Sequence, residues 1–459
     1  MSVFSLSNLK KTWYYLQKNG IRNAVWAVLE RIGQEQEVYT WQEPDEKTLS
    51  FQREHSASLR ISIVVPAYRT KKEHLEAMLN SVSKQSYPHW ELIVADAGGT
   101  AESVQAWAKK NGICLRKAAD ASNLAEWKDQ SIMLCTLSEN KGISANTNAG
   151  IELAAGDAVG LLDHDDLLTA NALWEMADCL EKEKKRGKQK LVLFSDEDKC
   201  DGAASRFYEP NFKPDFDGEL LLTNNYICHF TVIETAFLKE LKLRSGFDGA
   251  QDYDLMLRAH AAGGQFVHVP KVLYHWRCHE ASTASNPQSK RYAYEAGQRA
   301  LEDYCLRKGW KATVSGLKHL GFYREDYEDS VFCQRPEIGI WAKPLPGGRD
   351  IFGIRHPKGF LVSGLYENDG LMRYAGLRKG YSGPMHRAAL QQSAPAADLR
   401  SMEVCSALKE RYAQTIAELK EACQGLPTAA QETKILQKSM EFCKEATAAG
   451  YGILWDPQA

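Results

Sequence analysis

Residues 158–166 read Ala-Val-Gly-Leu-Leu-Asp-His-Asp-Asp, an apolar run that leads directly into a cluster of carboxylates. The run predicts a buried strand, and the edge where parallel strands end is where open α/β sheets place their ligands. Carboxylates such as Asp163 and Asp165 are ligands that Mg²⁺ and Mn²⁺ prefer, and the cation would accompany a diphosphate. The alternative is a solvated turn in which Asp166 caps a helix.

The sequence around this strand alternates buried-strand patterns with helical ones. Residues 61–66 form a nearly continuous β-branched run, residues 91–95 form a second apolar run, and a helix is expected between them at 72–85. This alternation predicts an α/β fold with a mostly parallel, doubly wound sheet. The remaining expected elements are helices at 144–155, 170–182, 253–262, 289–308, 404–423 and 428–450 and strands at 191–194, 226–232 and 266–274.

The 459 residues exceed the ~250–300 over which one core usually grows, so more than one domain is expected. We expect an N-terminal helical segment at 1–57, the α/β domain at 58–328 and a smaller α+β appendage at 329–459. Residues 450–457, near the end of the appendage, resemble residues 264–270 of the main domain. The appendage is therefore interpreted as a degenerate second copy that lacks a carboxylate cluster of its own.

Composition excludes several classes of protein. A net charge of −2 gives no field that would attract nucleic acid, and 11 singly scattered cysteines argue against a disulfide framework or a structural zinc site. No apolar stretch is long enough to span a membrane, so we expect the protein in the cytoplasm. Residues 1–33 mix aromatic side chains with Lys and Arg, which fits either packing on the main domain or peripheral contact with the inner membrane face.

Six motifs in order resemble the inverting glycosyltransferases of family 2, whose donor-binding domain has the GT-A fold. The closest resemblance is to bacterial rhamnosyltransferases and to other transferases of O-antigen and cell-envelope glycan assembly, through residues 195–199 and 225–227. The likeness covers about residues 1–325. The motifs are Val64 to Tyr68, Asp96, Asn140 to Gly150, Leu162 to Asp166, Gln251 to Leu255 and His275 to Ala284.

The resemblance implies a binding site for a nucleoside-diphosphate sugar of the dTDP or UDP type. Tyr68 and Asp96 would contact the base, although Asp96 followed by Ala97 departs from the family's acidic pair and also reads as a simple turn. Arg277 would pair with the diphosphate through its planar guanidinium. The implied donor-binding residues are Pro66, Ala67, Tyr68, Asp96, Gly142, Asn148, Asp163, His164 and Arg277.

The metal ligands implied by the resemblance are Asp165 and His279, with His275 as the alternative imidazole. The cation would be Mn²⁺ or Mg²⁺. The resemblance further implies residues that bind hydroxyl groups of the sugar or the acceptor. Each carboxylate among them also has a purely structural interpretation, either as part of an acidic turn after a strand or as a side chain favoured at a helix N-terminus by the helix dipole. These candidates are Asp196, Glu197, Asp254 and His275.

Asp252 is the implied catalytic base, because an inverting transferase acts by a single displacement and needs one carboxylate opposite the leaving group. Gln251 stands where relatives often have Glu, which removes a like charge beside the base. The alternative reading makes Asp252 an ordinary N-terminal helix residue.

These residues together imply a metal-dependent inverting glycosyltransferase of the hexosyltransferase type. It would move a sugar, with rhamnose favoured, from a nucleotide donor to a growing glycan or lipid-linked glycan of the bacterial surface. Nucleotidyl transfer is disfavoured, since no glycine-rich basic loop follows Pro66. A second alternative is a non-catalytic, nucleotide-binding partner subunit of a glycan-assembly complex, which Gln251 and Ala97 suggest.

Overall fold

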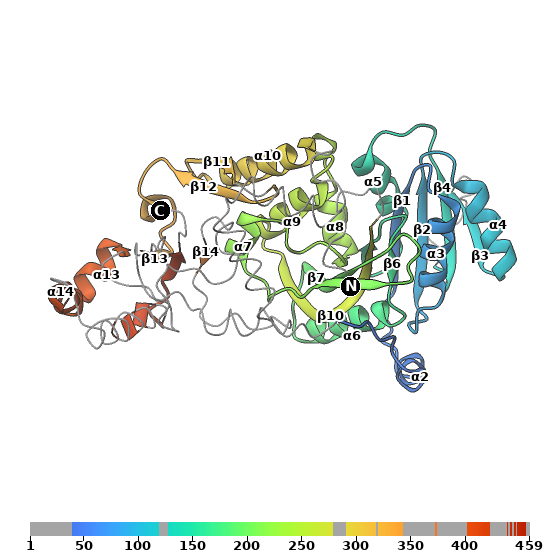
Figure 1. Ribbon diagram of the computed structural model, residues 1–459, viewed down its shortest axis with the longest axis horizontal. Coiled ribbons are helices and arrows are strands. Elements are labelled where there is room, and N and C mark those ends of the chain that lie inside the picture. The colour runs from blue at the N-terminus through green and yellow to red at the C-terminus, as the bar shows by residue number, and fades with distance from the viewer. Residues whose placement is uncertain are drawn as a thin grey trace, which may run out of the picture. The chain divides into compact units, whose positions relative to one another are not determined.

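The computed structural model describes most of the α/β domain and parts of the C-terminal region (Figure 1). The expected helical segment at 1–33, residue His279 and most of the expected last helix lie outside the described residues. The described ranges are 39–118, 127–278, 291–317, 320–342, 372–373, 402–422, 438, 441–442, 445–446 and 448–455.

The first half of the main domain alternates strands with helices, as the sequence predicts. Its parallel strands lie in the order β3-β4-β2-β1-β5. After helix α2 (Glu46–Glu54), the elements are β1 (Ile61–Ala67), α3 (Lys72–Ser83), β2 (Trp90–Asp96), α4 (Ala101–Asn111), β3 (Cys114–Lys117), β4 (Ser131–Thr136), α5 (Ile143–Leu153), β5 (Ala158–Leu161), β6 (Leu167–Leu168) and α6 (Ala172–Lys185).

The second half extends the same sheet in the order β5-β9-β7-β10-β6. Strand β9 runs antiparallel to both β5 and β7, whereas β10 runs parallel to β7. This arrangement confirms an α/β fold with a mostly parallel sheet. The elements are β7 (Leu191–Cys200), β8 (Phe207–Asn211), α7 (Gly218–Thr223), β9 (Thr231–Glu234), α8 (Thr235–Leu241), η2 (Ser245–Phe247), α9 (Gln251–Ala261), β10 (Gln265–Arg277) and α10 (Arg291–Lys308).

Strand β1 shows why the sheet is covered on both faces. Ile63 and Val65 lie in one apolar cluster with side chains of α3, α4 and α6, while Val64 lies in a second cluster with α5, α8, α9 and α10. Because successive side chains of a strand point to opposite faces, a continuous apolar run requires helices on each side. The run at 61–65 is fully buried, as this packing demands.

Two strands continue further than the sequence analysis predicted. β7 was expected to end at Phe194 and β10 at Tyr274, but their parallel pairing continues to Cys200 and Arg277. Polar residues are tolerated here because they pair with one another inside the sheet: His275 Nδ1 lies 2.5 Å from Asp198 Oδ1. The acidic turn expected after residue 194 is therefore wrong, since residues 195–200 belong to a buried strand.

The C-terminal region contains a hairpin and a second, small sheet. The expected helix at 404–423 is divided into two at Tyr412, and no described helix is long and apolar enough to cross a membrane. The elements are β11 (Ala312–Gly316), β12 (Tyr323–Tyr327), α11 (Val331–Gln334), β13 (Ile338–Ala342), β14 (Met372–Arg373), β15 (Met402–Val404), α13 (Ser406–Arg411), α14 (Ala413–Ala422) and β16 (Gly452–Trp455).

The pairing of the small sheet repeats that of the second half of the main sheet. Its order β15-β13-β16-β14 has antiparallel, parallel and antiparallel pairs, the same sequence of pairings as β9-β7-β10-β6. Helices separate β15 from β16, just as α8 and α9 separate β9 from β10. One difference is that β6 precedes β7 in the chain, whereas β14 follows β13.

Gly150 tests the packing of α5 on the sheet. A Cβ atom at this position would lie 2.6 Å from Val64 Cγ1, a stiff branched side chain in the centre of β1. We expect Gly150→Ala to lower the free energy of unfolding by about 1–2 kcal/mol, since overpacking outweighs the gain in helix propensity. Chemical denaturation would measure this change. Gly316→Ala, where a Cβ meets open space, is the matched control, and an equal effect of the two substitutions would contradict the packing.

Candidate active site

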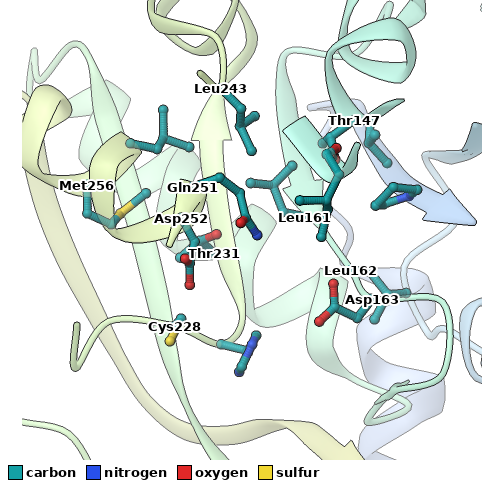
Figure 2. A pocket seen from close by; sticks show the side chains of 15 residues that line it. Thr147, Leu161, Leu162, Asp163, Cys228, Thr231, Leu243, Gln251, Asp252 and Met256 are labelled. Atoms are coloured by element: carbon teal, nitrogen blue, oxygen red, sulfur yellow. Dashed lines mark hydrogen bonds between the residues drawn. The ribbon is translucent and has the colours of Figure 1, made fainter. Parts of the chain in front are cut away.

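An open cavity of about 660 Å³ lies where the two halves of the main sheet meet. Figure 2 shows that its walls come from strand ends and helix starts of both halves, with Asp163 and Asp252 on different sides. The lining residues are Val64, Pro66, Ile143, Thr147, Leu161, Leu162, Asp163, Cys228, His229, Thr231, Leu243, Gln251, Asp252, Leu255 and Met256.

Asp252 lies in the first turn of α9 and is held by a neighbour that the sequence analysis did not single out for this role. Asn225 Nδ2 donates a hydrogen bond of 2.8 Å to Asp252 Oδ2. The Cys228 thiol also lies close by, and burial together with the charge of Asp252 raises the pKa of that thiol well above its usual range. An amide and a thiol thus orient the Asp252 carboxylate.

The carboxylates after β5 are not equivalent. Asp166 is buried, and it accepts hydrogen bonds from the Tyr274 hydroxyl at 2.5 Å and the Arg277 backbone N–H at 2.7 Å. Asp166 therefore joins β10 to the loop after β5 and does not line the cavity. This structural role is closer to the turn alternative of the sequence analysis than to ligand binding. Asp163 lines the cavity, and Asp165 lies beside it with its side chain 22% exposed.

Like charges make this cluster unfavourable as it stands. Burial raises the pKa of Asp163 above its usual range; the charge of His229 opposes this shift, while Asp165 and Asp252 add to it. Burial, Asp165 and Asp163 likewise raise the pKa of Asp166 well above its usual range. Carboxylates that repel one another at the edge of a cavity are stabilised by a bound cation.

The donor set at Asp163 and Asp165 fits a divalent cation in part. Mg²⁺ is commonly held by one or two carboxylates, with water and substrate phosphates completing its shell. Within the described ranges, no group of three or more His, Cys, Asp and Glu side chains is arranged to hold a metal ion. The second predicted ligand, His279, lies outside the described residues, so metal binding at Asp165 stays a prediction.

A buried charge cluster closes the floor of the cavity. Lys213 Nζ lies 3.3 Å from Glu197 Oε2, and His229 donates to the same oxygen from its backbone N–H, with its ring Nδ1 at 3.3 Å. Burial works against the ionised form of Glu197, but the charges of Lys213 and His229 lower its pKa to about 2. Glu197 therefore positions His229 and Lys213, and the side chain that lines the cavity is His229.

Among the predicted donor-binding residues at the ends of β1 and β2, only Pro66 lines the cavity. Ala67 is buried, and its carbonyl accepts a hydrogen bond from the Ala97 N–H. Tyr68 is exposed beneath the Arg69 guanidinium. The Asp96 carboxylate accepts hydrogen bonds from the N–H groups of Gly98, Thr100 and Ala101, which is the turn alternative.

Gly142 and Asn148 have structural roles in the described residues. Gly142 has φ +95°, and a Cβ there would clash with the Asp248 carboxylate. The Asn148 side chain exchanges two hydrogen bonds with the Leu243 backbone, at 2.8 and 2.9 Å, and so fixes a loop that lines the cavity. His164 does not line the cavity; its Nδ1 lies 3.8 Å from Asp165 Oδ1. These contacts position the site but do not form its surface.

Four predicted ligand-binding residues are engaged inside the protein. Arg277 is buried and donates to the carbonyls of Asp165 and Gly202 at 2.5 and 2.7 Å, so its guanidinium does not line the cavity. His275 pairs with Asp198, and Asp196 binds His268 Nε2 at 2.8 Å. Asp254 binds Arg244 and Arg258. The extended strands explain the first three, because they bury residues that the sequence analysis placed after strand ends.

Comparison with known proteins finds similarity to glycosyltransferases in part of the main domain. Residues 62–241 match the family model described as glycosyl transferase family 2. Over 256 residues, 56% of this chain, the sequence is 34% identical to the O-antigen biosynthesis protein RfbC of Myxococcus xanthus and covers 19% of that protein. It is 28% identical over 232 residues, 47% of this chain and 70% of the relative, to the amylovoran biosynthesis glycosyltransferase AmsB of Erwinia amylovora.

A solved structure also aligns with the main domain. The crystal structure of S. aureus TarS 1–349 in complex with UDP-GlcNAc covers 54% of this chain and 67% of its own, with a TM-score of 0.41 and 20% identity. The chain spans only 26% and 19% of the length of two curated relatives that it matches at 36% and 34% identity.

Asp254 and Asp252 make a matched pair for separating a structural carboxylate from a site carboxylate. Asp254 is 1% exposed and bridges two arginines, with Arg258 Nε at 2.9 Å. We expect Asp254→Asn to lower the free energy of unfolding by about 3–5 kcal/mol, because it leaves buried cations without their partner. Asp252→Asn should change it by less than about 1 kcal/mol. Urea unfolding followed by fluorescence measures both, and equal losses would contradict these assignments.

Proposed function

We propose that this chain, whose residues 62–241 match the model of glycosyl transferase family 2, is an inverting glycosyltransferase of bacterial surface-glycan biosynthesis. One observation carries the proposal: Asp163 and Asp252 come from different halves of the sheet and line one cavity. A carboxylate at each side of a donor sugar suits single displacement, with the leaving diphosphate on the Asp163 side and the acceptor on the Asp252 side.

In this reaction Asp252 is the general base. The acceptor hydroxyl gives its proton to the Asp252 carboxylate as its oxygen forms a bond to the anomeric carbon. The bond between that carbon and the diphosphate oxygen breaks, and the nucleoside diphosphate leaves with the electron pair. Asn225 and Cys228 support the base by holding the carboxylate at the cavity.

A divalent cation, Mn²⁺ or Mg²⁺, fits the carboxylates after β5. Asp165 would hold it, with Asp163 either as a second ligand or as a contact to the ribose. When bound, such an ion supplies positive charge that offsets the charge developing on a leaving diphosphate. Burial and, after it, the charges of Asp165 and Asp252 raise the pKa of Asp163, and this unfavourable placement of a carboxylate supports this part of the proposal.

The lining of the cavity supports a deoxysugar donor, and the proposed donor is rhamnose on dTDP, with UDP as the alternative nucleotide. On the Asp252 side the walls include the aliphatic side chains of Leu243, Leu255 and Met256, beside the polar Gln251 and Thr231. A methyl group in place of a hydroxymethyl group would pack favourably there, because an aliphatic wall offers no partner for the hydroxyl.

The proposed acceptor is a growing glycan or a lipid-linked glycan. Two relatives support this assignment by their names, one in O-antigen and one in amylovoran biosynthesis. Action on the cytoplasmic side, with peripheral membrane contact through residues 1–33, completes the proposal. We further propose that residues 329–459 are a degenerate second transferase-like domain, which the repeated strand pairing in the small sheet supports.

Asp252→Asn tests the base directly. With Mn²⁺ or Mg²⁺, a panel of nucleotide sugars and lipid-linked acceptors, we expect turnover to fall by at least about 100-fold, since the amide accepts no proton. Release of nucleoside diphosphate measures it, and binding of dTDP or UDP should persist. The exposed Asp326→Asn is the control. Nucleotide binding without turnover of any donor by the unchanged protein would instead favour the non-catalytic partner subunit.

Asp165→Asn tests the cation. Titration calorimetry with dTDP or UDP, with and without Mn²⁺, should show that the unchanged protein binds more tightly when the metal is present. The variant should lose most of this enhancement, because one anionic ligand has become a neutral amide. Its affinity in EDTA should match that of the unchanged protein. An Mn²⁺ enhancement of the same size in both proteins would show that Asp165 does not hold the metal.

A further inference from the structure

The charges around the cavity are unbalanced for a diphosphate. The lining contains two carboxylates, Asp163 and Asp252, and its one basic side chain is His229. The sequence analysis assigned Arg277 to the diphosphate, but its guanidinium donates hydrogen bonds to the carbonyls of Asp165 and Gly202. Any direct protein cation for the phosphates must therefore come, among the described lining residues, from His229.

The ring of His229 is held in one orientation. Its Nδ1 lies 3.3 Å from Glu197 Oε2, and its plane stacks on Tyr274 with the ring centroids 5.0 Å apart and an interplanar angle of 13°. Trp276 contacts the ring on another side, with centroids 5.5 Å apart. With Nδ1 engaged by Glu197, Nε2 is the nitrogen left to meet a ligand in the cavity.

Glu197 anchors His229 without cancelling its charge, because Lys213 offsets that carboxylate. Lys213 is buried and also donates 3.0 Å to the Ile227 carbonyl, so it is fixed behind the cavity wall. With Glu197 balanced by Lys213, a protonated His229 leaves the cluster with one net positive charge at the cavity. Burial opposes protonation of the imidazole. The hydrogen bond to Glu197 and the negative charges of Glu197, Asp163 and Asp166 nevertheless raise the pKa of His229 to about 9.

The position of His229 selects one phosphate. Its sequence neighbour Cys228 contacts Asp252. The antiparallel pairing of Leu161 with Thr231 directs His229 and Asp163 to the same end of the β5–β9 pair, and all three side chains, His229, Asp163 and Asp252, line the cavity. In the proposed reaction, the sugar lies between the base and the Asp163 cluster, and the phosphate bonded to that sugar lies on the Asp163 side. We propose that His229 Nε2 donates a hydrogen bond to the β-phosphate of the nucleotide donor and is the protein's own cation at the leaving group.

This inference rests on the proposed function and deepens it, and two substitutions at His229 test it. Asn places its amide nitrogen near the position of Nδ1, so His229→Asn keeps a donor to Glu197 but removes the nitrogen that faces the cavity. Gln places its amide nitrogen near the position of Nε2, so His229→Gln keeps a neutral donor to the phosphate. The exposed His89→Asn is the matched control.

Calorimetry in EDTA would measure the affinities for dTDP and dTMP, and for UDP and UMP. We expect His229→Asn to weaken diphosphate binding about 10-fold or more and to leave monophosphate binding unchanged. His229→Gln should show a smaller loss, and His89→Asn none. Thermal unfolding would establish that each variant is folded. If His229→Asn does not fold, His229→Gln alone tests the inference, because it should still weaken binding of the diphosphate more than binding of the monophosphate.

Two results would overturn the inference: unchanged diphosphate affinity in folded variants, or equal losses for mono- and diphosphates. The proposed function fails separately, if the unchanged protein binds neither nucleoside diphosphate with or without Mn²⁺. Binding measurements on the unchanged protein alone therefore test the proposed function, and the variants test only the role of His229.

Discussion

The register of β9 is the constraint on which the site depends. This strand is inserted antiparallel between β5 and β7, and Thr231 lies opposite both Leu161 and Phe194. Two residues beyond Leu161 is Asp163, two residues before Thr231 is His229, and three beyond Phe194 is Glu197. One set of backbone hydrogen bonds therefore brings together three charged side chains that are far apart in the sequence. A slip of β9 by one residue would turn its own side chains to the other face of the sheet and move His229 away from Asp163 and Glu197.

Several buried charges around this strand have a partner of opposite charge. Asp254 has two arginines, Asp198 has His275, and Glu197 has Lys213. At the cavity, burial raises the pKa of Asp163; the charge of His229 opposes this shift, and Asp165 and Asp252 add to it. The Asp252 carboxylate interacts there with an amide and a thiol. Because carboxylates that repel one another are costly, their concentration at the cavity is typical of a binding site.

Much of the scaffold follows from the sequence, because its signals are local. The β-branched run at 61–65 and the apolar run before Asp163 predict strands that lead to the cavity, and the first turn of α9 carries Asp252 as expected. Residues 195–200 and 275–277 were misplaced, since polar residues within a strand look like its end unless the pairing partner is known. His229 was missed for the converse reason: it stands in a segment that reads as an apolar strand, and only the register of β9 reveals its position.

The central claim is that Asp163 and Asp252 face one donor sugar from opposite sides. A crystal structure with a nucleoside-diphosphate sugar that cannot be hydrolysed, together with Mn²⁺, is the most direct measurement. The account predicts the diphosphate beside Asp163 and His229, with the anomeric carbon directed towards the Asp252 carboxylate. A nucleotide bound outside this cavity, or a sugar whose anomeric carbon is turned away from Asp252, would contradict it.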